Sequence, residues 1–218
     1  MNLPDRSPQR GFSLIVVLLI LIVTTVLGVG AAQVSLVNER GARNDRDTEV
    51  AFQAAEAALL DAESDVLGPN DSAQQRLCLF SSQDVTAFVA GCGGAGDHQG
   101  LCAPGEPGTE PAWMSADFSA GSGKSVAYGT FTGQTYFSGD AGTGSSRAGA
   151  LPARAPRYIV EAIRNHDGWQ VNALQSASAR SASYIFRVTA IGYGMRDETQ
   201  VVLQTNLYKS TASPGCPS

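Results

Sequence analysis

An uninterrupted apolar segment near the amino terminus constrains this chain more than any other feature. No charged residue occurs between Arg10 and Glu39, and residues 12–32 are almost entirely aliphatic or small. As an α-helix rising about 1.5 Å per residue, this segment is long enough to cross a hydrocarbon core of about 30 Å. We therefore expect a transmembrane helix over residues 12–32 rather than the buried helix of a soluble domain.

A cleaved Sec-type signal peptide is the alternative interpretation of this segment. Arg6 and Arg10 would form its basic amino-terminal region, and the small residues at 29–31 would supply a cleavage site. However, the apolar stretch before Gly28 is longer than the usual signal-peptide core of about 7 to 15 residues. The sequence after it also continues in a helical pattern, which favours a retained membrane helix.

The helical pattern extends well beyond the apolar segment. Residues 47–67 place apolar side chains at alternating spacings of three and four, which is one stripe along a helix. The stripe consists of Phe52, Ala55, Leu59, Ala62 and Val66. Gln53, Glu56 and Asp61 fall on the opposite face, Asp47 or Thr48 is a candidate cap, and Gly68-Pro69 ends the helix. We expect one helix over residues 12–67, transmembrane in 12–32 and amphipathic in 47–67.

Two further regions follow this helix. Residues 68–155 are rich in Gly and Ser and contain three of the four cysteines, a composition that predicts loops and short irregular strands. Residues 156–218 contain three segments rich in β-branched and aromatic residues, at 157–163, 183–194 and 198–209. These segments predict an antiparallel sheet that is followed by a carboxy-terminal tail, with a hairpin at 192–197. Since a sheet with one apolar face needs a cover, we expect an α+β fold with the amphipathic half-helix packed on the sheet.

Charge and motifs argue against several classes of function. The net charge is −5 and the Lys and Arg residues are scattered, so nothing predicts nucleic-acid binding. The sequence GSGKS at 121–125 lacks the glycine that a phosphate-binding loop needs five residues before Gly123, because Phe118 stands there. No catalytic residue and no cofactor are predicted, and we do not expect an enzyme.

The four cysteines are Cys78, Cys92, Cys102 and Cys216. All lie beyond the apolar segment, so in an exported domain we expect two disulfides, for which three pairings are possible. We expect Cys216 to attach the carboxy terminus to the loop-rich region. A zinc site from Cys92, His98 and Cys102, with Asp97 as the fourth ligand, is the weaker alternative, and we predict no metal.

The amino-terminal sequence resembles a known family. RGFSLIVVLLILIV, at residues 10–23, is similar to the type IV prepilin signature, a short charged leader ending in glycine, then phenylalanine and an apolar stretch. Residues 28–63 resemble the amino-terminal region of PilX-type minor pilins, and AFQAAEAAL is the most specific part. PRYIVEAI and the final hairpin resemble the sheet of that family more weakly. The resemblance implies a type IV pilin-like fold.

The resemblance also implies how the chain is processed, where it is located and what it assembles with. A prepilin peptidase would remove the leader, residues 1–11, by cutting after Gly11 and would methylate the new amino terminus of Phe12. The mature chain would sit in the bacterial inner membrane with its carboxy-terminal domain in the periplasm, and then enter a pilus. Its expected partners are other minor pilins, the major pilin and a PilY-type tip adhesin, and its expected role is priming pilus assembly. A tip pseudopilin of type II secretion is the alternative within this class.

Val16 departs from the general pilin pattern. Major pilins carry glutamate at the fifth mature position, which is Val16 here. That carboxylate is thought to neutralise the amino terminus of the preceding subunit, and the pairing matters because an unpaired charge in hydrocarbon costs several kcal/mol. A subunit with valine cannot make this pair, but the first subunit of a fibre has no predecessor. We therefore predict that Val16 marks a position at the pilus tip.

Overall fold

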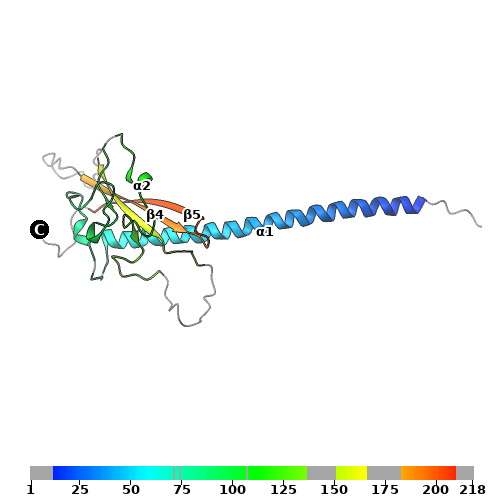
Figure 1. Cartoon of the computed structure of the whole chain (residues 1–218), viewed down its shortest axis with the longest axis horizontal. Coiled ribbons are helices and arrows are strands. Elements are labelled where there is room, and N and C mark those ends of the chain that lie inside the picture. The colour runs from blue at the N-terminus through cyan, green and yellow to red at the C-terminus, as the bar shows by residue number, and fades with distance from the viewer. Residues whose placement is uncertain are drawn as a thin grey trace, which may run out of the picture. The chain divides into compact units, whose positions relative to one another are not determined.

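The computed structural model describes residues 12–70, 72–73, 75–106, 108–136, 151–165 and 183–209 (Figure 1). These residues form two compact units, Met1–Arg46 and Asp47–Ser218, and the long helix α1 runs through both. In chain order the elements are α1 (Phe12–Leu67), η1 (Leu77–Leu79), η2 (Gly96–His98), β1 (Leu101–Cys102), α2 (Ala112–Ser115), β2 (Val126–Ala127), β3 (Arg157–Asn165), β4 (Ser183–Tyr193) and β5 (Gln200–Leu207).

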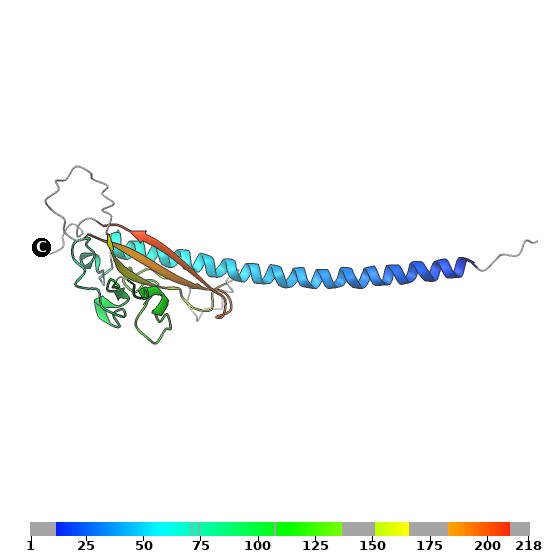
Figure 2. The same ribbon diagram turned by 90° about the horizontal axis from the view of Figure 1, so that it is seen from above.

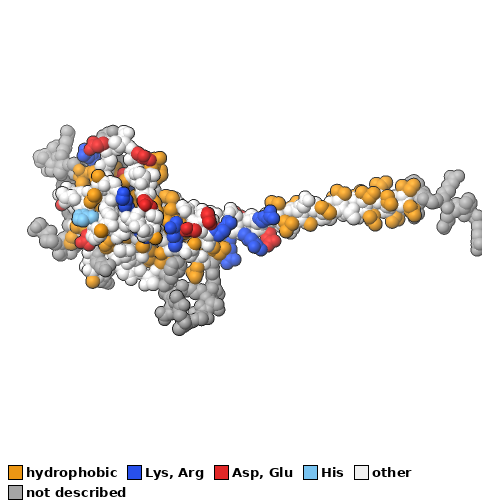
Figure 3. Space-filling view, viewed as in Figure 1, with side chains coloured by type: hydrophobic (Ala, Val, Ile, Leu, Met, Phe, Trp, Pro, Cys, Tyr) orange, Lys and Arg blue, Asp and Glu red, His pale blue; other side chains and the backbone are white. Residues whose placement is uncertain are grey.

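The first unit contains the apolar segment of α1 and, beyond it, the charged stretch of the helix that ends at Arg46 (Figure 3). Its helix is long and apolar enough to cross a membrane, and no residue of its most apolar stretch is buried in the protein. Thr24 and Thr25 donate their hydroxyl protons to the carbonyl of Leu21, so their polar groups are satisfied within the helix. Between Leu14 and Ala32 the helix therefore presents apolar side chains and internally bonded hydroxyl groups to a bilayer.

The second unit is built around a sheet in the order β1-β3-β4-β5, with β2 also paired to β3. The β3–β4 and β4–β5 ladders are antiparallel, as the hairpin pattern predicts. The short strand β1 runs parallel to β3, so the sheet is mixed. Apart from this one short parallel strand the sheet is antiparallel, and the predicted α+β class is confirmed.

The second half of α1 packs along one face of this sheet, as Figure 2 makes visible. Alanine dominates the contact, which brings the helix close to the strands. Gly192 of β4 marks the closest approach, because a Cβ atom there would lie 2.1 Å from the Ala51 carbonyl oxygen and 2.3 Å from the Ala55 nitrogen. Only glycine fits between this strand and the helix.

The observed packing face is rotated from the predicted stripe. Ala55, Ala62 and Val66 have no exposed surface, and Leu59 is partly buried against the core. Phe52 instead lies at the border of the face, 38% exposed. Asp61, expected on the polar face, is 2% exposed. The reason is size: a helix that approaches a sheet this closely buries small side chains, and the phenylalanine is displaced to the edge. The full buried stripe is Asp47, Ala51, Ala54, Ala55, Ala58, Asp61, Ala62, Asp65 and Val66.

The core beneath the helix is aromatic. Phe80, Phe88 and Phe186 form a cluster in which Phe88 stacks on Phe186 with ring centroids 5.5 Å apart, and Phe80 meets Phe186 edge-on at 5.6 Å. Phe186 comes from β4, whereas Phe80 and Phe88 come from the loop-rich region. This region therefore contributes to the core instead of lying wholly outside it.

Candidate functional site

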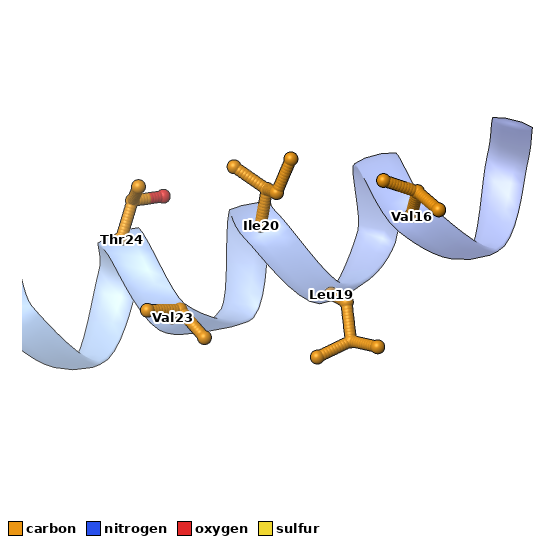
Figure 4. A pocket seen from close by; sticks show the side chains of 5 residues that line it. All are labelled: Val16, Leu19, Ile20, Val23 and Thr24. Carbon is orange, nitrogen blue, oxygen red and sulfur yellow. The ribbon is translucent and has the colours of Figure 1, made fainter.

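The predicted processing and assembly residues lie at the start of α1. Gly11 falls outside the described residues, and Phe12 is the first residue of the helix. Val16 borders a shallow hollow of about 240 Å³, together with Leu19, Ile20, Val23 and Thr24 (Figure 4). These five residues recur at helical spacings of three and four, so they form one stripe with no charged group. Such a stripe can pack against lipid or another apolar helix, and it offers no carboxylate to a neighbouring amino terminus.

Asp47 joins α1 to the β4–β5 turn. One carboxylate oxygen accepts the backbone N–H of Met195 at 2.5 Å and that of Arg196 at 3.3 Å. The other accepts the Thr199 hydroxyl at 2.5 Å and the Arg196 Nε–H at 3.1 Å. The Thr199 hydrogen bond, followed by those from Arg196 and Met195, holds the pKa of Asp47 below its usual value despite burial. Asp47 lies within the helix, so it is a tertiary contact and not the cap that the sequence suggested.

Asp61 joins α1 to the loop after β2. Its carboxylate accepts the backbone N–H of Gly129 at 2.8 Å and the hydroxyl of Thr132. Burial raises the pKa of Asp61, and these two hydrogen bonds only partly oppose that effect. The hydrogen-bond donors of the loop offset part of the cost of burying the Asp61 carboxylate.

Asp65 and Arg76 form an ion pair within the protein interior. The Arg76 Nη2 donates to Asp65 at 2.7 Å, and the two side chains are 1% and 0% exposed. The Tyr158 hydroxyl of β3 donates to the same carboxylate at 2.9 Å. Burial, together with the adjacent carboxylate, raises the pKa of Tyr158 well above its usual value, so the phenol remains a donor.

Arg76 also orders the chain around it. Its Nη1 donates to the carbonyls of Asp97 at 2.9 Å and Gln99 at 2.6 Å, and its guanidinium lies 3.7 Å from the centroid of the Phe131 ring. Through its ion pair with Asp65, this one side chain therefore connects the helix to two further stretches of the loop-rich region, at residues 97–99 and at Phe131. These stretches have little regular structure of their own, so Arg76 substitutes for missing backbone pairing.

Lys209 satisfies the carboxy-terminal end of α1. Its Nζ donates to the carbonyl of Val66 at 2.6 Å and to that of Leu77 at 2.8 Å. The last carbonyls of a helix lack partners within it and carry partial negative charge, so a buried ammonium is favourable there. Burial lowers the pKa of Lys209. The chain after β5 is thereby attached to the end of the helix.

The cysteines that the structure describes are disulfide-bonded. Cys92 pairs with Cys102, and Cys78 is also disulfide-bonded, whereas Cys216 lies outside the described residues. The Cys92–Cys102 bond removes both thiolates from the alternative zinc site. His98 instead places its Nδ1 2.7 Å from the Ala87 carbonyl oxygen. The disulfide and the His98 contact therefore have a structural role in this part of the loop-rich region, which they hold together.

A small polar pocket lies on the other face of the sheet. Its volume is about 230 Å³, and its charged lining includes Glu161 and Arg187, which form an ion pair at 2.7 Å. Glu161 also accepts the backbone N–H of Ala112 at 3.3 Å. The ion pair therefore engages Glu161 and Arg187 within the protein, and the same lining also includes the charged residues Glu106 and Arg164.

Sequence comparison decides the family. A family model described as PilX N-terminal matches residues 10–60, and one described as type IV pilus assembly protein PilX, C-terminal, matches residues 98–209. The chain belongs to the PilX family. No curated protein and no solved structure matches it. The first match spans the prepilin-like junction and the apolar half of α1, and the second spans the whole sheet, so the PilX resemblance is confirmed over both. PilX proteins are components of type IV pili. Neither match covers residues 61–97, the segment that contains Asp61, Asp65 and Arg76.

Proposed function

We propose that this protein is a minor pilin that a prepilin peptidase cuts after Gly11 and methylates on the amino group of Phe12. The PilX match that begins at residue 10 and continues through an apolar helix supports this proposal most directly. In this mechanism the leader stays in the cytoplasm, the apolar half of α1 is held in the inner membrane, and the second unit folds in the periplasm, where its disulfides form. The mature chain then enters a pilus.

The contacts of the second unit suit a subunit that is extracted from a membrane. Asp47, Asp61 and Asp65 lie along 19 residues of α1, and each is held by a different part of the domain. Lys209 holds the end of the same helix. A force applied through the helix is therefore distributed over four polar attachments and an alanine-packed interface. We propose that this lets the domain follow its helix without unfolding.

Val16 supports a position at the pilus tip. Without a carboxylate at this site, the subunit cannot neutralise the amino terminus of a subunit ahead of it, but it can lead. We propose that it primes assembly with other minor pilins, is followed by major pilin and presents a PilY-type adhesin. Val16→Glu should insert normally yet change the recovery of minor-pilin complexes. Wild-type recovery of these complexes and wild-type piliation in this variant would argue against the tip position.

The mass of the mature amino-terminal peptide tests the processing step. We expect a peptide that begins at methylated Phe12, and Gly11→Val should accumulate as precursor in the inner membrane. Gly28→Ala is the matched control, since a Cβ there meets nothing within 4 Å in this protein. A mature terminus near Ala32 would replace the proposal with a Sec-type signal peptide. Recovery of the mature chain with a secretion pseudopilus, and not with pili, would instead identify a tip pseudopilin.

A further inference from the structure

Among the residues that the structure describes, strand β5 is the last strand of the sheet and its outer edge has no strand partner. It pairs with β4 over eight consecutive positions, from Gln200 opposite Tyr193 to Leu207 opposite Phe186. On its other side, no strand pairs with it among the residues that the structure describes. A strand in this position has backbone N–H and C=O groups directed away from the sheet, and those groups can pair with another extended chain.

The register identifies which groups these are. The Gly194 nitrogen donates to the Thr199 carbonyl at 2.8 Å, which makes these two residues a hydrogen-bonded pair at the turn. Because such pairs alternate in an antiparallel ladder, Val201, Leu203, Thr205 and Leu207 direct their backbone groups to β4. Gln200, Val202, Gln204 and Asn206 therefore direct theirs outward. The free edge offers four N–H and four C=O groups over about 20 Å of strand.

This edge lacks the features that usually prevent pairing. Natural edges are blocked by charges, proline or a bulge. The β5 sequence, QVVLQTNL, contains no charge and no proline, and its register to β4 is continuous. Glu198 precedes the strand, and the next charged residue after it, Lys209, is 8% exposed. Nothing within β5 therefore opposes the addition of another strand.

The side chains on the two faces define what fits. Val201, Leu203 and Leu207 face the α1 side of the sheet and are only partly buried, because no strand lies beyond them in the described residues. Val202, on the opposite face, is 50% exposed. An added strand with apolar residues at alternate positions would cover the first three side chains. Its backbone would satisfy the outward groups of β5.

A second copy of this chain is a poor candidate for that strand. Within the second unit, α1 runs in the same direction as β5, since Asp47 contacts the residue before the strand, Thr199, and Val66 contacts the residue Lys209 just after it. Two copies joined antiparallel through β5 are related by a two-fold axis, which points their α1 helices in opposite directions. Subunits that follow one another in a fibre point in the same direction, so a pairing that reverses the second unit does not fit a pilus.

We propose that the free edge of β5 binds an extended strand, apolar at alternate positions, donated by another protein of the pilus. The inference rests on the proposed pilus function and assigns β5 as the surface that holds a partner. Backbone pairing supplies the affinity, and the partly buried side chains on the α1 side select the register.

Amide hydrogen exchange on the full chain in detergent tests the free edge first. The amides of Val202, Gln204 and Asn206 should exchange rapidly, whereas those of Val201, Leu203 and Thr205 should be protected. In the chain incorporated into purified pili, the first three should become protected as well. Protection of all six in the isolated chain would overturn the inference, because the edge would then be occupied by another segment of the same chain or by a second copy.

Val202→Pro tests the role of the edge in assembly. Proline removes an outward N–H and leaves the hydrogen bonds to β4 in place, as is tolerated on edge strands. Val202→Ala is the matched control, since it loses the same side chain but keeps the N–H. We expect the proline variant to be recovered from pili roughly tenfold less than the alanine variant, with similar amounts of mature protein in the membrane. Equal recovery of both variants in pili would overturn the inference and leave the pilus function standing, whereas absence of the unmodified chain from pili would refute that function itself.

Discussion

Replacing Arg76 with methionine should destabilise the second unit severely. The substitution keeps much of the side-chain volume but removes the guanidinium that Asp65 faces at 2.7 Å, with both side chains almost fully buried. Asp65 would then keep only the Tyr158 hydroxyl among the donors described for it. The carbonyls of Asp97 and Gln99 would lose their shared donor as well.

The expected cost follows from burial. Removing one partner of a buried ion pair typically costs about 3–5 kcal/mol, because the remaining charge is left without compensation. Against a total stability of about 5–15 kcal/mol, this is a large fraction. In Asp65→Asn/Arg76→Met both charges are gone, so the double variant should regain roughly 1 kcal/mol or more over Arg76→Met alone. A double variant that is more stable than Arg76→Met alone would show that the single variant is destabilised by an uncompensated charge.

Urea unfolding of the full chain in mild detergent, with disulfides intact and followed by tryptophan fluorescence, gives these free energies. Arg43→Met is the matched control, because Arg43 pairs with Glu39 at 2.5 Å while both side chains are largely exposed, 79% and 56%. An exposed pair of this kind contributes about 0.5 kcal/mol or less. The reasoning is refuted if Arg76→Met costs under about 1 kcal/mol, or no more than Arg43→Met.

Three further perturbations test other contacts by the same unfolding measurement. Gly192→Ala should cost about 1–3 kcal/mol because its Cβ would overlap the α1 backbone, whereas Gly121→Ala, with nothing within 4 Å, should cost nothing measurable; equal effects would contradict the close approach. The folded-state pKa of Asp47 lies below its unfolded value, so the stability that its carboxylate contributes is present above about pH 4 and is lost as pH falls through the folded pKa. The difference in unfolding free energy between the unmodified chain and Asp47→Asn should therefore shrink on acidification. A difference that stays constant with pH would contradict this. Replacing both Cys92 and Cys102 with alanine should cost roughly 2–3 kcal/mol for a crosslink that spans ten residues, and an unchanged midpoint would show that the disulfide does not restrain the unfolded chain.

The sequence predicts the elements of the fold well where periodicity is strong. The limits of α1, Phe12–Leu67, agree with the apolar run, the helical stripe and the Gly68-Pro69 stop. The strands β3, β4 and β5 agree with their alternating and β-branched segments. In both cases the pattern reflects burial directly, so it can be read without knowing the partner element.

The buried polar contacts of α1 were not predicted because hydrophobic patterning treats charge as a mark of exposure. For this reason the pattern predicts Asp61 on the polar face and does not distinguish Asp65 or Arg76 from exposed charges. A usable signal was present, since Asp47, Asp61 and Asp65 follow the same spacing as the buried alanines. Their donors lie 11 to 152 residues away along the chain, and no local pattern identifies donors at that distance.

Burying both alanines and aspartates on one helix face solves a single geometric problem. A helix that approaches a sheet closely enough to contact Gly192 leaves no room for large apolar side chains, so packing alone buries little surface per residue. The aspartates compensate because each reaches a separate loop or turn and receives two or more hydrogen bonds or an ion pair from it. These bonds are directional, so they also fix the rotation of the helix, which a stripe of methyl groups does not. For a subunit that we propose is pulled by this helix, resistance to rotation and sliding matters more than buried area.

The same reasoning predicts the effect of Asp61→Ala, which leaves the alanine packing intact. Hydrogen exchange in the loop at Gly129 and Thr132 should become faster before the unfolding midpoint falls. If loop protection and the unfolding midpoint were lost together, the contact would serve only general stability.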